Sequence, residues 1–220
     1  MDTIRGRFLK QHLLSDQFLD LIEKNKRPMD ELMSYYQCAI MEVETKFKVL
    51  NQEYSLEYDR NPIEGIKTRV KSYDSILRKI RRKNIPMTLE GIEENIRDIA
   101  GVRVICSFPD DIYELAESFL RQDDITLIER KDYIKNPKES GYRSLHLLVE
   151  VPIFLSDRTY NMPVEIQIRT IAMDTWASLE HELKYKSKKE MPGYVVQELK
   201  NCAKSMADLD ASMERIHKML

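Results

Sequence analysis

The chain has 220 residues, of which 42% are hydrophobic, enough to build a substantial core in one large or two small domains. Its 35 basic and 37 acidic residues nearly cancel, so net charge does not indicate a nucleic acid or a membrane as partner. Three widely spaced cysteines, Cys38, Cys106 and Cys202, argue against a disulfide framework or a zinc site. Since no apolar run approaches the ~18 residues of a membrane span, we expect a cytoplasmic protein.

The first half of the chain reads as helical. Apolar residues at helical spacing predict a helix over residues 30–54. Asn61-Pro62 predicts the start of a second helix, with Asn61 as N-cap and Pro62 in the first position, running to about Lys83. A short helix is expected at about 88–96.

The second half alternates strands and helices. A strand is predicted over 101–108 and a helix over 110–121, followed by strands near 125–131, 144–151 and 164–170. Two helices, at about 171–186 and 192–219, close the chain. This order predicts an α+β (mixed α/β) fold, a mixed sheet flanked by helices with helical extensions at both ends.

The strand at 164–170 carries the most informative pattern. It alternates apolar and polar residues, so Glu165, Gln167 and Arg169 share one face of the sheet and the apolar residues share the other. A carboxylate, an amide and a guanidinium on one face are candidates for chemistry, although an ordinary solvated face would produce the same pattern.

A local cluster of cations occupies residues 67–83. It contains eight basic residues against one acid, Asp74, and Lys71, Arg78 and Arg82 are spaced to share a helix face with Lys79 beside them. Such a stripe suits a polyphosphate, whose charge several cations share. A nucleic-acid backbone and a solvated helix face are the alternatives.

Asp98 is placed where the short helix gives way to a strand, three residues before Gly101. A carboxylate there and Glu165 on a neighbouring strand could jointly hold Mg²⁺, which prefers oxygen ligands and commonly uses one or two carboxylates plus substrate phosphates. The alternative is that Asp98 only pairs with Arg97 or Arg103.

A polar glycine turn leads into the strand at 144–151. Tyr142, directly after Gly141, could lie against a planar ring, and His146 shares its strand face. Core packing for the tyrosine and a structural role for the histidine are the plainer interpretations.

Four motifs together resemble the RelA/SpoT-type (p)ppGpp synthetases: Arg69-Val70-Lys71, residues 97–103, residues 141–146 and residues 165–170. The resemblance covers about residues 58–190. It implies a nucleotidyltransferase-like sheet in a catalytic domain at 58–190, a helical extension at 1–57 and a C-terminal helix at 191–220. No His-Asp dipeptide, the metal-binding signature of the family's hydrolase domain, is present, so we expect a small alarmone synthetase, closer to the RelP branch than to RelQ.

The resemblance also implies a reaction and its residues. The 3′-hydroxyl of GDP or GTP attacks the β-phosphorus of ATP, so that pyrophosphate is transferred and AMP released. By motif, the ATP-binding residues are Arg69, Lys71, Lys79, Arg82 and Arg103. Of these, Arg69 and Arg103 are implied to stack on the adenine. Asp98 and Glu165 are implied as catalytic residues and Mg²⁺ ligands, with Glu165 also placed as a base. The implied GDP/GTP-binding residues are Lys138, Tyr142, His146, Gln167 and Arg169.

Assembly and regulation are also implied. A heptad-like seam in the last helix (Leu199, Cys202, Met206, Leu209, Met213, Ile216 and Leu220) predicts packing against another subunit or against its own domain. Small synthetases of this kind are typically homotetramers, which favours packing against another subunit. Gly65 stands where an aromatic residue is expected in a product-activated enzyme, so we expect little activation by product.

Two rival functions remain at this stage. A related toxin class pyrophosphorylates the tRNA 3′ end, and Lys184, Lys186, Lys188 and Lys189 offer a patch for tRNA. A non-catalytic RNA-binding module could use the 67–83 stripe, but it leaves Asp98 and Glu165 without a function.

Overall fold

Five strands form one mixed sheet at the centre of the computed structural model, which describes residues 16–58, 60–186 and 191–219. The strands are β1 (Ile63–Val70), β2 (Ala100–Cys106), β3 (Thr126–Asp132), β4 (Leu145–Phe154) and β5 (Thr159–Thr170). Their spatial order is β1-β2-β5-β4-β3. Only β2 and β5 run parallel; the other neighbours are antiparallel, as the predicted mixed α+β fold requires.

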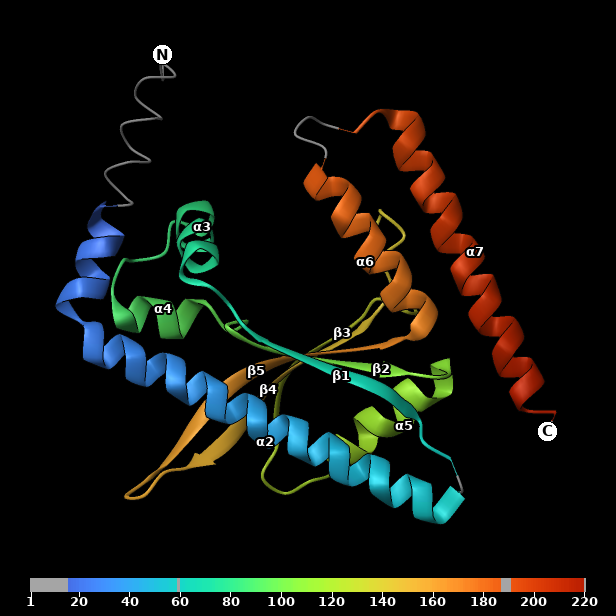
Figure 1. Ribbon diagram of the computed structural model, residues 1–220, viewed down its shortest axis with the longest axis horizontal. Helices are drawn as coiled ribbons and strands as arrows, with labels where there is room; N and C mark the ends of the chain where they lie inside the picture. The colour runs from blue at the N-terminus through green and yellow to red at the C-terminus, as the bar shows by residue number, and fades with distance from the viewer. Residues whose placement is uncertain (1–15, 59, 187–190, 220) are drawn as a thin grey trace.

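Helices lie around this sheet (Figure 1). They are α2 (Lys26–Tyr58), α3 (Tyr73–Lys83), α4 (Leu89–Asn95), α5 (Pro109–Leu120), α6 (Ile171–Lys186) and α7 (Gly193–His217). Residues 16–24 are also helical. The helices predicted at 30–54, 88–96, 110–121, 171–186 and 192–219 are therefore confirmed within a few residues.

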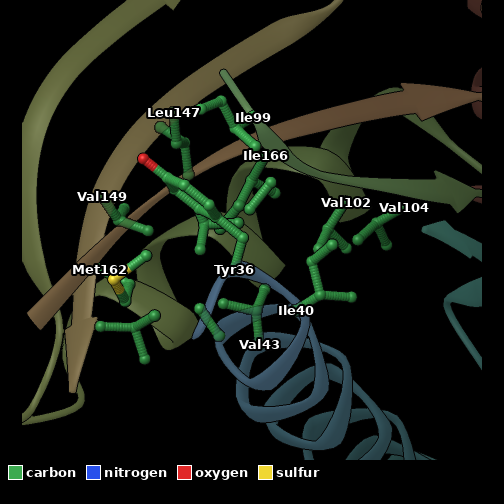
Figure 2. Close-up of a cluster of buried hydrophobic side chains, with 14 of the residues drawn as sticks. Tyr36, Ile40, Val43, Ile99, Val102, Val104, Leu147, Val149, Met162 and Ile166 are labelled. Atoms are coloured by element: carbon green, nitrogen blue, oxygen red, sulfur yellow. The ribbon is translucent and has the colours of Figure 1, made fainter. Parts of the chain in front are cut away.

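The core lies between the sheet and the long helix α2, which crosses one face of it. Tyr36 and Ile40 of α2 pack against apolar side chains of the central strands, among them Val102, Leu147 and Ile166 (Figure 2). Because side chains alternate along a strand, every second residue of β2 and β4, and of β5 from Met162 to Ile168, is buried toward this core. The residues between them point to the opposite face, which leaves that face available for polar groups.

The helix predicted from Asn61 to Lys83 is wrong over its first half. Residues Ile63–Val70 form β1, which pairs with β2, and α3 begins only at Tyr73. Apolar residues spaced four apart, such as Ile66 and Val70, match a helical period, but the edge of the sheet supplies hydrogen-bond partners that override this local signal. Lys71 consequently precedes α3 and does not share a helix face with Arg78 and Arg82.

A second apolar cluster joins α6 to α7. Trp176 and Ala203 form its centre, and Leu199 and Met206 of the predicted seam pack against it. The rest of the seam points outward: Leu209, Met213 and Ile216 are about half exposed and Cys202 is exposed, while Leu220 falls outside the described residues. Among the described helices, none combines the length and apolarity that crossing a membrane demands.

Candidate active site

Strand register aligns two rows of residues, most of them polar, across the face of the sheet opposite α2. One row runs Lys67, Arg103, Gln167, His146 and Lys131, with one residue from each strand paired to the next. The adjacent row runs Arg69, Gly101, Glu165, Leu148 and Glu129. Residues from five separate strands thus reach one surface, because their positions within the strands keep the same parity.

Two adjacent cavities open over these rows. The first cavity has a volume of about 240 Å³. It is lined by His146 and by basic side chains from three places: helix α3, strand β3, and the segment that precedes β2. The second, of about 120 Å³, lies over β1 and β2 and is lined by Arg69, Gly101 and Arg103 among others. Asp98 and Glu165 line both cavities, so they stand at the border between them.

Asp98 is held by two lysines. Lys71 Nζ lies 2.8 Å from Oδ2 and Lys79 Nζ lies 2.6 Å from Oδ1. Burial by itself raises the pKa of this carboxyl, but the two ammonium groups outweigh it and hold the pKa below its usual value. The alternative pairing with Arg97 or Arg103 is therefore not the one formed. Asp98 stays ionised, and the two lysines supply cations beside it.

Glu165 is also half-buried and hydrogen-bonded. Gln167 Nε2 donates to its Oε2 at 3.0 Å, and His146 Nδ1 lies 3.7 Å from Oε1. Burial raises the pKa of this carboxyl, while the contacts with His146 and Gln167 lower it, and the net effect is a pKa below the usual value. The structure thus brings two charged carboxylates together at the border of the cavities.

Tyr142 lies beside this pair, among cations. Its hydroxyl is 2.8 Å from His146 Nε2 and accepts from Arg169 Nη2 at 2.5 Å. Lys138 Nζ and the Arg169 guanidinium lie 4.8 Å and 5.0 Å from the centre of its ring, within the range of cation–π attraction. The five residues predicted around the acceptor nucleotide are therefore neighbours, since Arg169 Nη2 also donates to Gln167 Oε1 at 2.6 Å.

Asp174, in the first turn of α6, was not singled out by the sequence. It is buried and accepts from Lys67 Nζ at 2.9 Å, Arg103 Nη1 at 3.1 Å and Arg169 Nη1 at 3.3 Å. Burial raises its pKa, but these three cations hold it below the usual value. Asp174 thereby links Arg103, which lines the second cavity, to Arg169, which lies beside Tyr142. Only its place four residues after the Glu165–Thr170 motif could have suggested it.

The other predicted residues differ in their placement. Lys79 lines the first cavity, whereas Arg82 is exposed on α3 and is not among the lining residues of either one. Sequence reasoning missed Glu129 and Lys131, which line the first cavity from β3. On an edge strand with four charged residues in a row after Ile128, nothing local distinguishes these two from solvated charges.

The turn before Tyr142 requires a glycine. Gly141 has φ +92°, and a Cβ there would lie 2.6 Å from Ala203 Cβ in α7. We expect Gly141→Ala to lower the free energy of unfolding by about 1–3 kcal/mol through backbone strain and by about as much again through the overlap. Denaturant unfolding measures this loss.

Gly65→Ala is the matched control, because no atom lies within 4 Å of the Cβ it would add. Its stability should stay within about 0.5 kcal/mol of the original chain. Equal stability of the Gly141→Ala and Gly65→Ala variants would contradict the packing of this turn against α7.

Similarity to known proteins agrees with this geometry. Residues 68–190 match the protein family described as "Region found in RelA / SpoT proteins". The GTP pyrophosphokinase YwaC of Bacillus subtilis (strain 168) is 46% identical over 183 residues, which are 83% of this chain and 87% of that protein.

Two crystal structures from Bacillus subtilis are similar in fold. Small alarmone synthetase 2 superimposes with a TM-score of 0.80 at 44% identity, covering 87% of this chain and 99% of that one. Small alarmone synthetase 1, bound to its product pppGpp, superimposes with a TM-score of 0.80 at 38% identity, covering 88% of this chain and 98% of that one. The family match covers more than half of the chain, and both structures superimpose over most of it. This chain therefore belongs to the RelA/SpoT family, as one of its small alarmone synthetases.

Proposed function

We propose that this chain is a GTP pyrophosphokinase. It transfers the β,γ-pyrophosphate of ATP to the 3′-hydroxyl of GDP or GTP, forming ppGpp or pppGpp and releasing AMP. The observation that carries the proposal is the pair of cavities that share Asp98 and Glu165 at their border. The acceptor nucleotide must lose its 3′-hydroxyl proton close to the point where the bond between the α- and β-phosphates of ATP breaks. The border between the cavities can accommodate both reacting groups.

The second cavity is the proposed site of the ATP base. Arg69 and Arg103 come from paired strands and line this cavity, while Gly101 contributes no side chain to it. Guanidinium planes stack on the faces of aromatic rings, and a glycine lets a flat ring approach the backbone. Adenine between the two arginines would point its triphosphate toward Asp98.

Cations continue from that point into the first cavity. Lys79, Lys83 and Lys131 line it, and Lys71 lies against Asp98. Clustered ammonium groups match the charge of a polyphosphate. Arg82, which is exposed on α3, would have to change its rotamer to join them. Guanine of the acceptor is proposed to stack on Tyr142, with Lys138 and His146 beside its sugar or phosphates.

Asp98 and Glu165 suit Mg²⁺ by their chemistry. Both are ionised carboxylates that line the same two cavities, and Mg²⁺ commonly takes one or two carboxylates plus substrate phosphates. Bound there, the ion would neutralise charge that develops on the transferred phosphates. Glu165 accepts the proton of the 3′-hydroxyl as that oxygen bonds to the β-phosphorus. The bond to the bridging oxygen of the α-phosphate breaks, and AMP leaves with that oxygen.

The decisive experiment is to incubate the purified chain with ATP, Mg²⁺ and either GDP, GTP or deacylated tRNA, and to separate the nucleotides by chromatography. We expect AMP together with a guanosine tetra- or pentaphosphate. Labelled tRNA without a new guanine nucleotide would support the toxin-type alternative. Retention of RNA without AMP release would support a binding module. For the tRNA patch, Lys184 is engaged by Glu180, and Lys188 and Lys189 fall outside the described residues.

The two nucleotide sites should be separable by mutation. Arg103→Ala is expected to weaken ATP binding, and Tyr142→Ala to weaken GDP binding, each by about 1–3 kcal/mol, or roughly five- to 150-fold in affinity. Stacking on one base is lost in each variant while the other platform remains. Titration calorimetry with a non-hydrolysable ATP analogue and with GDP measures both affinities, and equal losses of both nucleotides in either variant would contradict separate platforms.

Assembly and regulation are proposed on two further observations. The exposed apolar residues of α7, Leu209, Met213 and Ile216, are available for packing against other subunits, so we infer a homotetramer. Gly65 on β1 offers no side chain for a product-binding site. We therefore expect added ppGpp to change the rate of alarmone synthesis little. The N-terminal helix and residues 61–76 resemble the RelP branch more than RelQ, so we place the chain nearer RelP.

A further inference from the structure

Five side chains, Glu165 among them, form a ring of four hydrogen bonds and one longer contact. Arg169 Nη2 donates to Tyr142 OH at 2.5 Å and to Gln167 Oε1 at 2.6 Å. Tyr142 OH lies 2.8 Å from His146 Nε2, and His146 Nδ1 lies 3.7 Å from Glu165 Oε1. Gln167 Nε2 donates to Glu165 Oε2 at 3.0 Å, which closes the ring.

Proton counting gives the ring a direction. A guanidinium can only donate, so the Tyr142 oxygen and the Gln167 carbonyl are both acceptors from Arg169. The single phenol proton is then available for His146 Nε2, which leaves the imidazole proton on Nδ1, facing Glu165. Both arms therefore run from Arg169 to the two oxygens of one carboxylate, one ending in the 3.0 Å hydrogen bond from Gln167 and the other in the 3.7 Å contact with His146. Each oxygen keeps a second lone pair for a proton or an ion.

Arg169 is itself held in place by Asp174 of α6. Its side chain is 4% exposed, and Nη1 donates to Asp174 Oδ1 at 3.3 Å. Asp174 also binds Lys67 and Arg103 and is buried in α6. Arg169 is buried and, like Tyr142, is not among the residues that line either cavity. Its contacts lead instead to Tyr142 and Gln167.

We propose that Arg169 is a positioning residue, which orients Glu165 through Tyr142 on one arm and Gln167 on the other. Tyr142 then has two separable functions: its ring stacks on the acceptor base, and its hydroxyl holds His146 against Glu165. The inference rests on the proposed function in taking Glu165 as the reacting carboxylate. It adds to the role that the family motif implies for Arg169 and Gln167, because both lead to the carboxylate, while Gln167 also lines the second cavity.

Tyr142→Phe isolates the second function, since it removes one oxygen and keeps the ring. We expect kcat to fall about tenfold, the effect of leaving buried hydrogen-bonding groups without a partner. The KM for GDP should stay within about twofold, whereas Tyr142→Ala raises it. Tyr54→Phe is the matched control: it also deletes a phenol hydrogen bond, to Ser118 Oγ at 3.0 Å between α2 and α5, and should leave kcat unchanged.

A double-mutant cycle tests whether Arg169 is the origin of both arms. Arg169→Lys keeps the positive charge but cannot donate in a fork to Asp174, Gln167 and Tyr142 at once. We expect it to lower kcat by more than Tyr142→Phe does, and to leave Tyr142→Phe with less than a twofold further effect. Circular dichroism and the thermal midpoint establish that the variants are folded.

A spectroscopic readout makes the test independent of turnover. In ¹⁵N-histidine spectra, assigned with His146→Gln, the ring predicts the Nδ1–H tautomer for His146, and Tyr142→Phe and Arg169→Lys should each convert it to a mixture. The proposal is overturned if His146 carries its proton on Nε2, if Tyr142→Phe raises KM without lowering kcat, or if the two substitutions act additively. An original chain that shows the Nδ1–H tautomer but makes no alarmone would refute the proposed function alone.

Discussion

Glu165→Gln is expected to lower the turnover of pyrophosphate transfer by about 10²–10⁴-fold while leaving the fold intact. The two side chains are nearly isosteric, and the amide oxygen can still accept from Gln167 Nε2, which lies 3.0 Å from Oε2 in the original chain. The substitution removes the negative charge, which both proton acceptance and metal ligation need. Single-turnover assays at saturating ATP and GDP measure the loss of the chemical step.

Glu150→Gln is the matched control for this experiment. Glu150 also lies on the sheet, opposite Pro163 of β5, but it is not a lining residue of either cavity. Its turnover should equal that of the original chain. If the Glu165→Gln protein keeps more than about a tenth of the original turnover, the assignment of Glu165 as base is wrong.

The double substitution Leu209→Glu and Met213→Glu is expected to dissociate the proposed oligomer without unfolding the catalytic sheet. Both side chains are about half exposed on α7, and neither belongs to the cluster formed by Trp176 and Ala203. Burying an unpaired carboxylate in an apolar interface costs several kcal/mol, so the protomers should separate. Light scattering gives the mass, and circular dichroism reports the fold.

The apolar exchange Leu209→Met with Met213→Leu is the control, because it keeps the seam apolar and should keep the mass of the original assembly. An original chain that is already monomeric would contradict the oligomer proposal. Loss of secondary structure in the Glu variant would instead show that these residues stabilise their own domain.

The sequence by itself determined the features that depend on local periodicity. Alternation in residues 164–170 placed Glu165 and Gln167 on one face of a strand and Ile166 on the other, as β5 has them. Asp98 was placed correctly between a short helix and a strand, because caps and strand patterns are local signals. The family resemblance had the same origin, in short motifs that each occupy one element or turn.

Only the tertiary structure decided which elements pair and which charges meet. Residues 63–70 carry a helix-like period, yet they form β1 because the free edge of β2 satisfies their backbone groups. Asp174 joins Lys67, 107 residues away in the chain, to Arg103 and Arg169. The two rows of polar residues follow from strand register, which sets distances between residues far apart in sequence. Contacts between residues far apart in the sequence produce no local periodicity. The hydrogen bonds around Glu165 therefore could not be predicted from the sequence and follow only from the assembled sheet.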